Sequence, residues 1–280
     1  MRIVDSCAEC LYDKQQNMTD DEEYLSVVRE IIDNRSETDT SPYLVYLFNK
    51  EYEKRHGKGI SYKEIKKEYN DLVLSMEDTI RAKIEESEDP LATSFLYARI
   101  GNYIDFGAMN SVDTDTFLSL FDDAKLSGQD LKTMESFVAQ CEKGQRFILM
   151  TDNCGEVVLD KLFVEQMKKR FPHLDIKVMV RGGEVLNDAT EEDAKYVGLD
   201  KVATVISNGN TVAGTVHEML PSEARAIFDA ADVRLAKGQG NYESMCGQGR
   251  HIFYSFLCKC DLFTSRFQVP KLTGMFVEEI

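Results

Sequence analysis

Side chains that bind metal ions follow a short apolar run near the middle of the chain. The run is RFILM (146–150), and the stretch TDNCGE directly after it holds Asp152, Asn153 and Glu156. Carboxylate and amide oxygens are hard ligands suited to Mg²⁺ or Mn²⁺, and a site with few protein oxygens leaves positions open for water and a phosphate. The stretch therefore indicates a metal site, although Asp152 and Asn153 alone also fit a helix cap or an Asx-turn.

Three more apolar runs in the second half of the chain end in polar residues. The runs and the residues of interest after them are IKVMV (176–180) with Asp188, ATVI (203–206) with Ser207, and VRLA (233–236) with Lys237, Gly238, Gly240 and Asn241. Lys237 would bring positive charge to an anion, and the glycines allow the backbone to approach a ligand closely. Two plainer interpretations stay open: Asp188 as a helix cap, and the glycines as a turn whose spacing fits neither a Walker nor a dinucleotide motif.

The apolar runs must be parallel strands of one sheet for these residues to meet. After Gly144 they alternate with amphipathic segments that we interpret as helices, at 156–170, 190–197, 222–230 and 252–260. Such alternation is typical of βα units in a mainly parallel sheet with helices on both faces. Because ligands of such sheets lie beyond the carboxyl ends of the strands, all four polar groups should converge at that edge.

The first half of the chain has the pattern of helices, with no clear strand. Apolar residues in 61–86 recur every three or four positions, which lays one stripe along an amphipathic helix. We therefore predict an all-helical domain at 1–144 and an α/β/α domain at 145–280. Helix starts are expected at Ser41-Pro42 and Asp89-Pro90, and helix ends at Gly57 and Gly144.

The chain carries a strong net negative charge. Its 280 residues include 33 Lys plus Arg against 49 Asp plus Glu, a formal net charge of −16. The field of such a protein repels phosphate backbones and anionic lipid headgroups, so we expect neither a nucleic acid nor a membrane as partner. A small anionic substrate would need a local cation. Since no signal-like or membrane-spanning apolar run is present, we expect a cytoplasmic protein.

Seven cysteines leave more than one interpretation open. Their odd number in a long chain favours reduced thiols over a disulfide framework. Cys7, Cys10, Cys258 and Cys260 would form a four-thiolate zinc site if the chain ends meet, but the close spacing of the second pair departs from the usual template. Buried, inert thiols are the plainer interpretation, and a redox pair at Cys7 and Cys10 has less support because it does not follow a strand.

Five separated motifs resemble the proteins with domain of unknown function 89, the metal-dependent damage-control phosphatases. They are CAEC (7–10), ARIGNYIDFGA (98–108), TDNCGEVVLDKL (151–162), GGEVLNDATEEDAKYVGL (182–199) and AADVRLAKGQGNYES (230–244). The KGQGN block is similar to the stand-alone microbial branch, whereas a related branch has an Arg-Thr-x-Lys motif there. The resemblance implies an N-terminal all-helical domain packed on a Rossmann-like three-layer α/β/α domain.

The resemblance also implies which residues form the site. Asp152, Asn153 and Asp188 would hold a divalent metal, and Lys237 with the glycines beside it would border the phosphate. Glu156 would support the metal ligands or act on a water molecule. Cys154 departs from the family pattern, where Ala or Ser is more usual. The residues expected at the substrate are Asn102, Asp105, Ser207, Gly238, Gly240 and Asn241.

We therefore predict a phosphatase that uses a divalent metal (Mg²⁺, Mn²⁺, Co²⁺ or Ni²⁺) to remove phosphate from small phosphorylated metabolites, such as sugar phosphates or damaged derivatives. Two alternatives stay open. An S-adenosylmethionine-dependent carboxyl methyltransferase would need a glycine-rich loop after the first strand, and TDNCGE has one glycine. A non-catalytic metal-binding interaction protein would use the acidic helical half as its partner surface. The sequence leaves the substrate, the native metal and the oligomeric state open.

Overall fold

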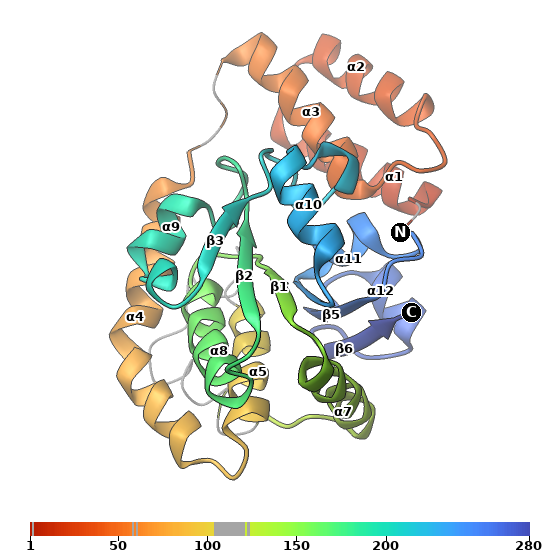
Figure 1. Cartoon of the computed structure of the whole chain (residues 1–280). Helices are drawn as coiled ribbons and strands as arrows, with labels where there is room; N and C mark the ends of the chain where they lie inside the picture. Colours follow the sequence, from red (N-terminus) through yellow and green to blue (C-terminus); the bar gives the residue numbers. More distant parts are fainter. Residues whose placement is uncertain (2, 58, 60, 104–120, 122–123) are drawn as a thin grey trace.

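The computed structural model describes residues 1, 3–57, 59, 61–103, 121 and 124–280 (Figure 1). Its helices are α1 (Asp5–Met18), α2 (Glu22–Asp33), α3 (Ser41–His56), α4 (Lys63–Glu86), α5 (Pro90–Ile100), α7 (Gly128–Lys143), α8 (Glu156–Arg170), α9 (Glu191–Tyr196), α10 (Ser222–Ala230), α11 (Gln239–Met245) and α12 (Asp261–Phe267). Its strands are β1 (Arg146–Met150), β2 (Asp175–Val180), β3 (Thr204–Ser207), β4 (Val233–Lys237), β5 (Ile252–Leu257) and β6 (Gly274–Glu279).

The six strands form one sheet in the order β3-β2-β1-β4-β5-β6. All neighbouring pairs from β3 to β5 are parallel, and β6 pairs antiparallel with β5 at one edge. The four predicted apolar runs become β1 to β4, and the predicted segments at 156–170, 190–197 and 222–230 contain α8, α9 and α10. The predicted α/β fold with a mainly parallel sheet is therefore confirmed.

Strand β1 is apolar after its first residue because both of its faces are buried. Side chains alternate between the faces of a strand, so Phe147 and Leu149 enter one core cluster while Ile148 and Met150 enter another. The first cluster includes side chains of α4, α5, α7 and α8, and the second includes side chains of α10, α11 and α12. Figure 1 shows the sheet between these two groups of helices. Both faces are covered, which is the expected condition for a parallel sheet.

The predicted helix at 252–260 is wrong, because residues 252–257 form the fully buried strand β5. The run is Ile-Phe-Tyr-Ser-Phe-Leu, and aromatic and β-branched side chains fit a pleated surface better than a short helix. Each of its six residues is buried between helices or the neighbouring strands β4 and β6. A short apolar run without polar breaks does not distinguish a buried strand from a buried helix by period alone.

The predicted helix ends are mostly confirmed. Asp89 caps α5 by accepting from the Ala92 N–H at 3.0 Å, and the N–H groups of Gly57 and Gly144 close the last turns of α3 and α7. The start predicted at Ser41 is off by one residue: Ser41 is the first helical residue, and Thr40 occupies the cap position without a side-chain bond. The predicted helix at 61–86 is α4. Within the described residues before β1 no strand is found.

Helices from the first half of the chain belong to two different cores. The helices α1, α2 and α3 enclose a small cluster of their own around Tyr24, Val28 and Phe48. The helices α4 and α5 instead share the large cluster with the sheet, for example through Phe95, whose ring lies 4.3 Å from that of Phe276. The division into domains at residues 144 and 145 stays a prediction.

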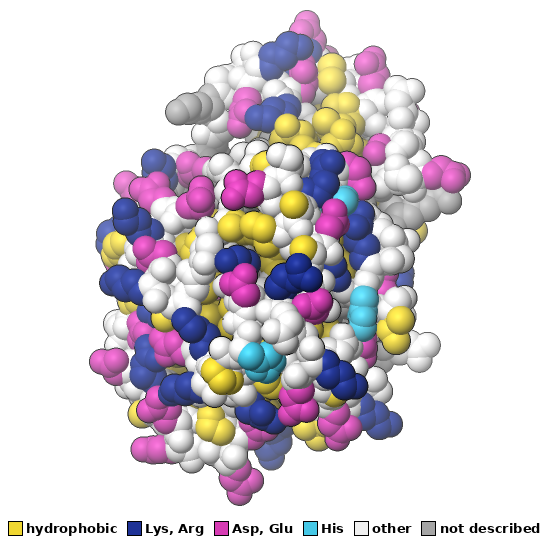
Figure 2. Space-filling view, in the orientation of Figure 1, with side chains coloured by type: hydrophobic (Ala, Val, Ile, Leu, Met, Phe, Trp, Pro, Cys, Tyr) yellow, Lys and Arg dark blue, Asp and Glu magenta, His cyan; other side chains and the backbone are white. Residues whose placement is uncertain are grey.

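Charged side chains of both signs are mixed on the surface. Figure 2 shows lysines and arginines interspersed with aspartates and glutamates over one face of the molecule. In the described part of the chain, none of the helices has both the length and the apolar character that crossing a membrane requires.

Phe137 on α7 is a central contact of the large core. Its ring lies 5.3 to 6.4 Å from the rings of four other phenylalanines, which come from β1, α8, β5 and β6: Phe147, Phe163, Phe253 and Phe276. We predict that Phe137→Ala lowers the free energy of unfolding by about 3–5 kcal/mol, because it leaves a cavity between these rings. Urea denaturation measures the loss. Leu131→Ala on the same helix is the control, since this side chain is 50% exposed and its loss should cost at most about 0.5 kcal/mol.

Candidate active site

Backbone hydrogen bonds tie the end of β1 to the loop after β2. The N–H groups of Cys154 and Ala189 donate across this gap at 2.8 Å each. They form an isolated antiparallel bridge between Asn153 and Asp188. Since β1 and β2 are neighbours in the sheet, the bridge brings the three predicted metal ligands together at the carboxyl edge.

The three predicted metal ligands are hydrogen-bonded to neighbouring side chains. Asp152 Oδ2 accepts from the side-chain amides of Asn102 at 2.8 Å and of Asn153 at 2.9 Å. Asp188 Oδ2 accepts from Arg181 Nε at 2.6 Å. Because the amide nitrogen of Asn153 is a donor, its oxygen is the atom that this side chain can present to a cation.

Glu156, the first residue of α8, is fully buried beside these ligands. Its Oε2 accepts from the amides of Asn102 at 2.8 Å and Asn153 at 3.3 Å. Its Oε1 accepts from Lys237 Nζ at 2.7 Å. Glu156 thus connects the predicted metal ligands to Lys237. Its expected role on a water molecule stays a prediction.

Lys237, the last residue of β4, is surrounded by oxygen acceptors. Its ammonium donates to the Ala98 carbonyl at 3.0 Å and to Glu156 and Asp160 at 2.7 Å each. Burial alone lowers the pKa of Lys237, but Asp160 and Glu156 outweigh it and raise the pKa above its usual value. Burial raises the pKa of Asp160 to about 7, although Lys237 opposes the rise. These contacts favour a supporting role for Lys237, and direct contact with phosphate stays a prediction.

The site buries more negative than positive charge. Four carboxylates face two cations, and all six side chains are at most 12% exposed: Asp152, Glu156, Asp160, Asp188, Arg181 and Lys237. Burial, followed by Asp188 and Glu156, raises the pKa of Asp152 to about 8. Buried charges are normally paired or coordinate a metal. With all four carboxyl groups ionised, the shortfall of two positive charges corresponds to one divalent cation. With oxygen donors only, Asp152, Asn153 and Asp188 fit a hard divalent metal.

Glycines after β4 make room for the site. Gly238 has φ of 81°, and a Cβ added to it would lie 2.0 Å from Asp152 Oδ2. A Cβ on Gly240 would lie 2.2 Å from the Ala213 carbonyl oxygen. Any larger residue at Gly238 would therefore displace the Asp152 carboxylate. Contact of either glycine with phosphate stays a prediction.

The other residues expected at the substrate have different positions. Asn102 is buried at the metal ligands, and Asn241 is buried where its Oδ1 accepts from Arg181 Nη1 at 3.3 Å. Ser207 bonds locally, because its hydroxyl accepts from the backbone N–H two residues later at 3.0 Å. Asp105 lies outside the described residues. The substrate roles of all four stay predictions.

Three charged residues near the site were given no role from the sequence, although Arg181 was among the polar residues expected at the end of β2. Asp160 follows Glu156 by four positions, and residues at this spacing share one helix face, so a signal was present. Arg181 directly follows the buried β2, where a charged residue is also a signal. Lys259, whose charge lowers the pKa of Asp152, follows β5, and it had no signal while that strand was interpreted as a helix.

The cysteines are free thiols. Burial, and then Glu243 and Cys260, raises the pKa of Cys7, so the two ends of the chain do lie close. Even so, the described residues contain no group of three or more His, Cys, Asp or Glu side chains arranged to hold a metal. The four-thiolate zinc site thus has no support there. The predicted metal centre is not a group of that kind, since it has two carboxylates and an amide.

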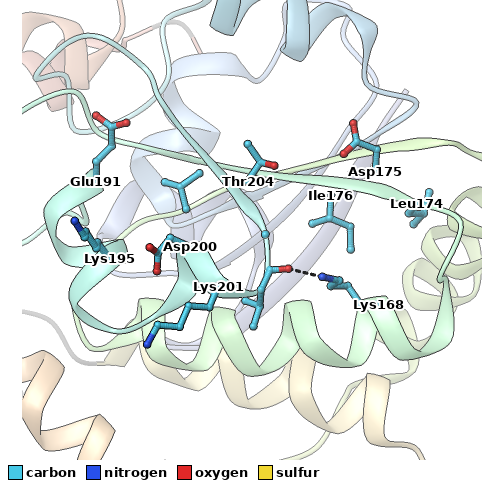
Figure 3. Close-up of a pocket in the computed structure, with 12 residues that line it drawn as sticks. Lys168, Leu174, Asp175, Ile176, Glu191, Lys195, Asp200, Lys201 and Thr204 are labelled. Atoms are coloured by element: carbon cyan, nitrogen blue, oxygen red, sulfur yellow. Dashed lines mark hydrogen bonds between the residues drawn. The ribbon is translucent and has the colours of Figure 1, made fainter.

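A surface hollow of about 580 Å³ lies away from this site (Figure 3). It is lined by the first residues of β2 and β3, including Asp175 and Thr204, and by Lys168, Lys195 and Lys201. The figure shows Lys168 donating to the carbonyl of Val202, a bond of 2.8 Å. The hollow is at the amino ends of the strands, opposite the edge where Asp152 and Asp188 meet.

A family profile and several related proteins match this chain over most of its length. A profile of the damage-control phosphatase ARMT1-like domain matches residues 2–273. A damage-control phosphatase of Archaeoglobus fulgidus is 27% identical, over 93% of this chain and 93% of the relative. A damage-control phosphatase of Pyrococcus horikoshii is 29% identical, over 74% and 71% of the two chains. An uncharacterized protein of Methanocaldococcus jannaschii is 28% identical, over 93% and 90%.

A solved structure has the same fold. The crystal structure of a protein of the domain-of-unknown-function 89 family from Pyrococcus horikoshii superposes with a TM-score of 0.82 over 99% of each chain, at 22% sequence identity. Because the family profile covers nearly the whole chain, the predicted resemblance to this family is confirmed. The assignment to a stand-alone microbial branch with the N-terminal Cys7-x-x-Cys10 stays a prediction. The chain belongs to the damage-control phosphatase ARMT1-like family, the proteins with domain of unknown function 89.

Proposed function

We propose that this chain is a divalent-metal-dependent phosphatase that acts on small phosphorylated metabolites, such as sugar phosphates or damaged derivatives. Two of its relatives are named damage-control phosphatases. The observation that carries the proposal is the surplus of buried negative charge around Asp152 and Asp188 at the carboxyl edge of the sheet. An oxygen-lined site with this surplus is suited to a divalent cation and, through it, to a phosphate group.

Asp152, Asn153 and Asp188 are the residues that would hold the metal. A divalent cation bound there supplies Lewis-acid polarisation of a phosphoryl oxygen and a lowered pKa for a bound water. The chain's own groups fix the ligands: the amide of Asn102 bonds both Asp152 and Glu156, each at 2.8 Å. Asn102 comes from the helical half and its partners from the sheet, so substrate would bind where the two halves meet.

Positive charge is needed because the chain as a whole repels anions, with a formal net charge of −16. A bound divalent cation would offset the four carboxylates of the site. Lys259 is partly exposed and lowers the pKa of Asp152, so it adds positive charge on the same side. Mg²⁺, Mn²⁺, Co²⁺ and Ni²⁺ all suit oxygen and amide donors, and their order of affinity follows the Irving–Williams series for the transition metals.

The two alternative functions have less support. A methyltransferase that binds S-adenosylmethionine would need a glycine-rich turn between β1 and α8, and that turn has the single glycine Gly155. A non-catalytic metal-binding protein is less well supported, because two relatives over most of the chain are named damage-control phosphatases. Assaying phosphate release from a panel of phosphate esters with each divalent metal separates all three functions.

We predict that Asp152→Asn lowers metal-dependent phosphate release by roughly a hundredfold or more, equivalent to about 2.7 kcal/mol of transition-state stabilisation. The substitution keeps the shape of the side chain and removes one anionic ligand. Without metal, the free energy of unfolding should stay equal or rise, because a buried and incompletely balanced carboxylate is lost. Phosphate-release kinetics and urea denaturation in the presence of a chelator measure the two quantities.

Asp175→Asn is the matched control. Asp175 starts β2 at the opposite end of the sheet, its side chain is 58% exposed, and it pairs with Lys177 at 3.0 Å. Its substitution should leave the metal-dependent rate within about twofold. Full metal-dependent turnover in Asp152→Asn, with Asp175→Asn unchanged, would contradict the assignment of the metal centre.

We predict that Lys237→Met lowers the free energy of unfolding by about 3–5 kcal/mol, because Glu156 and Asp160 are left buried without their cation. The double variant Lys237→Met with Asp160→Asn should recover part of this loss. Urea denaturation of both variants in a chelator makes the comparison. A nearly stable Lys237→Met protein with a large loss of turnover would instead favour direct contact between Lys237 and phosphate.

A further inference from the structure

Arg181, the residue after β2, is placed between the two acidic ligands. Its Nε donates to Asp188 Oδ2 at 2.6 Å, and its Nη2 lies 3.7 Å from Asp152 Oδ1. The side chain is only 1% exposed. A cation this close to metal ligands weakens metal binding by repulsion, so its presence there needs a reason.

The guanidinium is held in place on several sides. Its Nη1 donates to Asn241 Oδ1 at 3.3 Å, and that oxygen also accepts from Thr215 at 2.8 Å. The amide nitrogen of Asn241 donates to the Thr151 and Lys237 carbonyls at 3.1 and 2.7 Å. The backbone N–H of Arg181 is bonded at 2.9 Å to the loop that carries Asp188. These bonds hold the guanidinium of Arg181 beside Asp188.

Hydrogen bonds bias which oxygens the ligands present to a metal. Arg181 donates to Asp188 Oδ2, and its positive charge repels a cation from that oxygen, so binding through the other oxygen of Asp188 is favoured. Asp152 Oδ2 already accepts from the amides of Asn102 and Asn153. Asn153 has a single oxygen. The contacts therefore favour a site in which each ligand faces the cation with one oxygen.

We propose that Arg181 is a positioning residue that keeps Asp188 monodentate and thereby makes the site selective for small octahedral cations over Ca²⁺. The inference rests on the proposed metal site. Mg²⁺ and Mn²⁺ are satisfied by six ligands, several of them water, whereas Ca²⁺ favours six to eight oxygens and bidentate carboxylates. The guanidinium of Arg181, bonded to Asp188 Oδ2, disfavours the use of that second oxygen by Ca²⁺.

A purely electrostatic role for Arg181 makes a different prediction. If Arg181 were only a counter-charge, removing it would strengthen the binding of every divalent cation by the same factor, since all carry the same charge. If Arg181 positions Asp188, removing it takes away the repulsion at Asp188 Oδ2, and Ca²⁺, which favours bidentate carboxylates, gains more than Mn²⁺. The ratio of the two affinities distinguishes these roles, and a merely structural role would not change that ratio.

The test compares Mn²⁺ and Ca²⁺ affinities, measured by calorimetry on the full chain, for the wild type, Arg181→Met and Arg234→Met. We expect Arg181→Met to lower the Ca²⁺-to-Mn²⁺ ratio of dissociation constants at least tenfold. Arg234→Met is the control: Arg234 is partly buried on β4, and its guanidinium donates to the carbonyls of Phe228 and Asp229 at 2.9 and 3.0 Å, away from the site. An unchanged ratio in folded Arg181→Met overturns the proposal.

A second measurement needs no variant at Arg181 and decides the question if that protein fails to fold. Pulse electron paramagnetic resonance of Mn²⁺ bound to the wild type, in H₂O and D₂O, counts exchangeable water ligands. Three protein oxygens predict about three waters. Two waters or fewer would show a further protein oxygen on the metal and overturn the proposal. If Asp152→Asn binds Mn²⁺ as the wild type does, the metal site itself is wrong; if it does not bind and the ratio test fails, only the role of Arg181 is wrong.

Discussion

The burial of four carboxylates against two cations at the carboxyl edge of the sheet constrains the rest of the structure. Removing a charge from water is costly, and the cost is recovered only where partners are held in place. The partners come from several elements: Glu156 and Asp160 lie on α8, Lys237 ends β4, Asp152 follows β1, and Arg181 follows β2. The parallel sheet is the scaffold on which these elements end at one edge.

The helical half completes this site. Its Asn102 joins Asp152 to Glu156, its Ala98 carbonyl accepts from Lys237, and its Asn70 on α4 accepts from the Gly155 N–H at 2.7 Å. These bonds join the start of α8 to helices of the first half, which share a hydrophobic core with the sheet. The site and the joint between the halves are thus one structure. A substitution in this buried hydrogen-bond network should therefore change the free energy of unfolding as well as the proposed metal binding.

Most of the correct predictions came from apolar runs that end in polar residues, because these runs indicated both the strands and the edge at which the polar residues meet. RFILM and IKVMV were identifiable as strands because both faces of an inner parallel strand are apolar, and TDNCGE had to follow the first of them. The strand β5 was missed because an unbroken apolar run has no period that separates it from a helix. The pairing of side chains could not be predicted from the sequence. The bond from Lys237 to Asp160 and the bond from Arg181 to Asp188 depend on tertiary packing, which local sequence does not indicate.

The hydrogen bonds around Asp152 and Asp188 also offset the repulsion between these two side chains. Two like charges at the ends of neighbouring strands repel one another. Arg181 lies between Asp152 and Asp188, and Asn102 and Asn153 donate to Asp152, so each carboxylate keeps a donor on one oxygen. In the proposed metal site, the same donors would also restrict how a bound metal approaches these carboxylates. Ordering of the ligands and selectivity between metals would then have one physical cause, which is the set of donors already bonded to the acidic side chains.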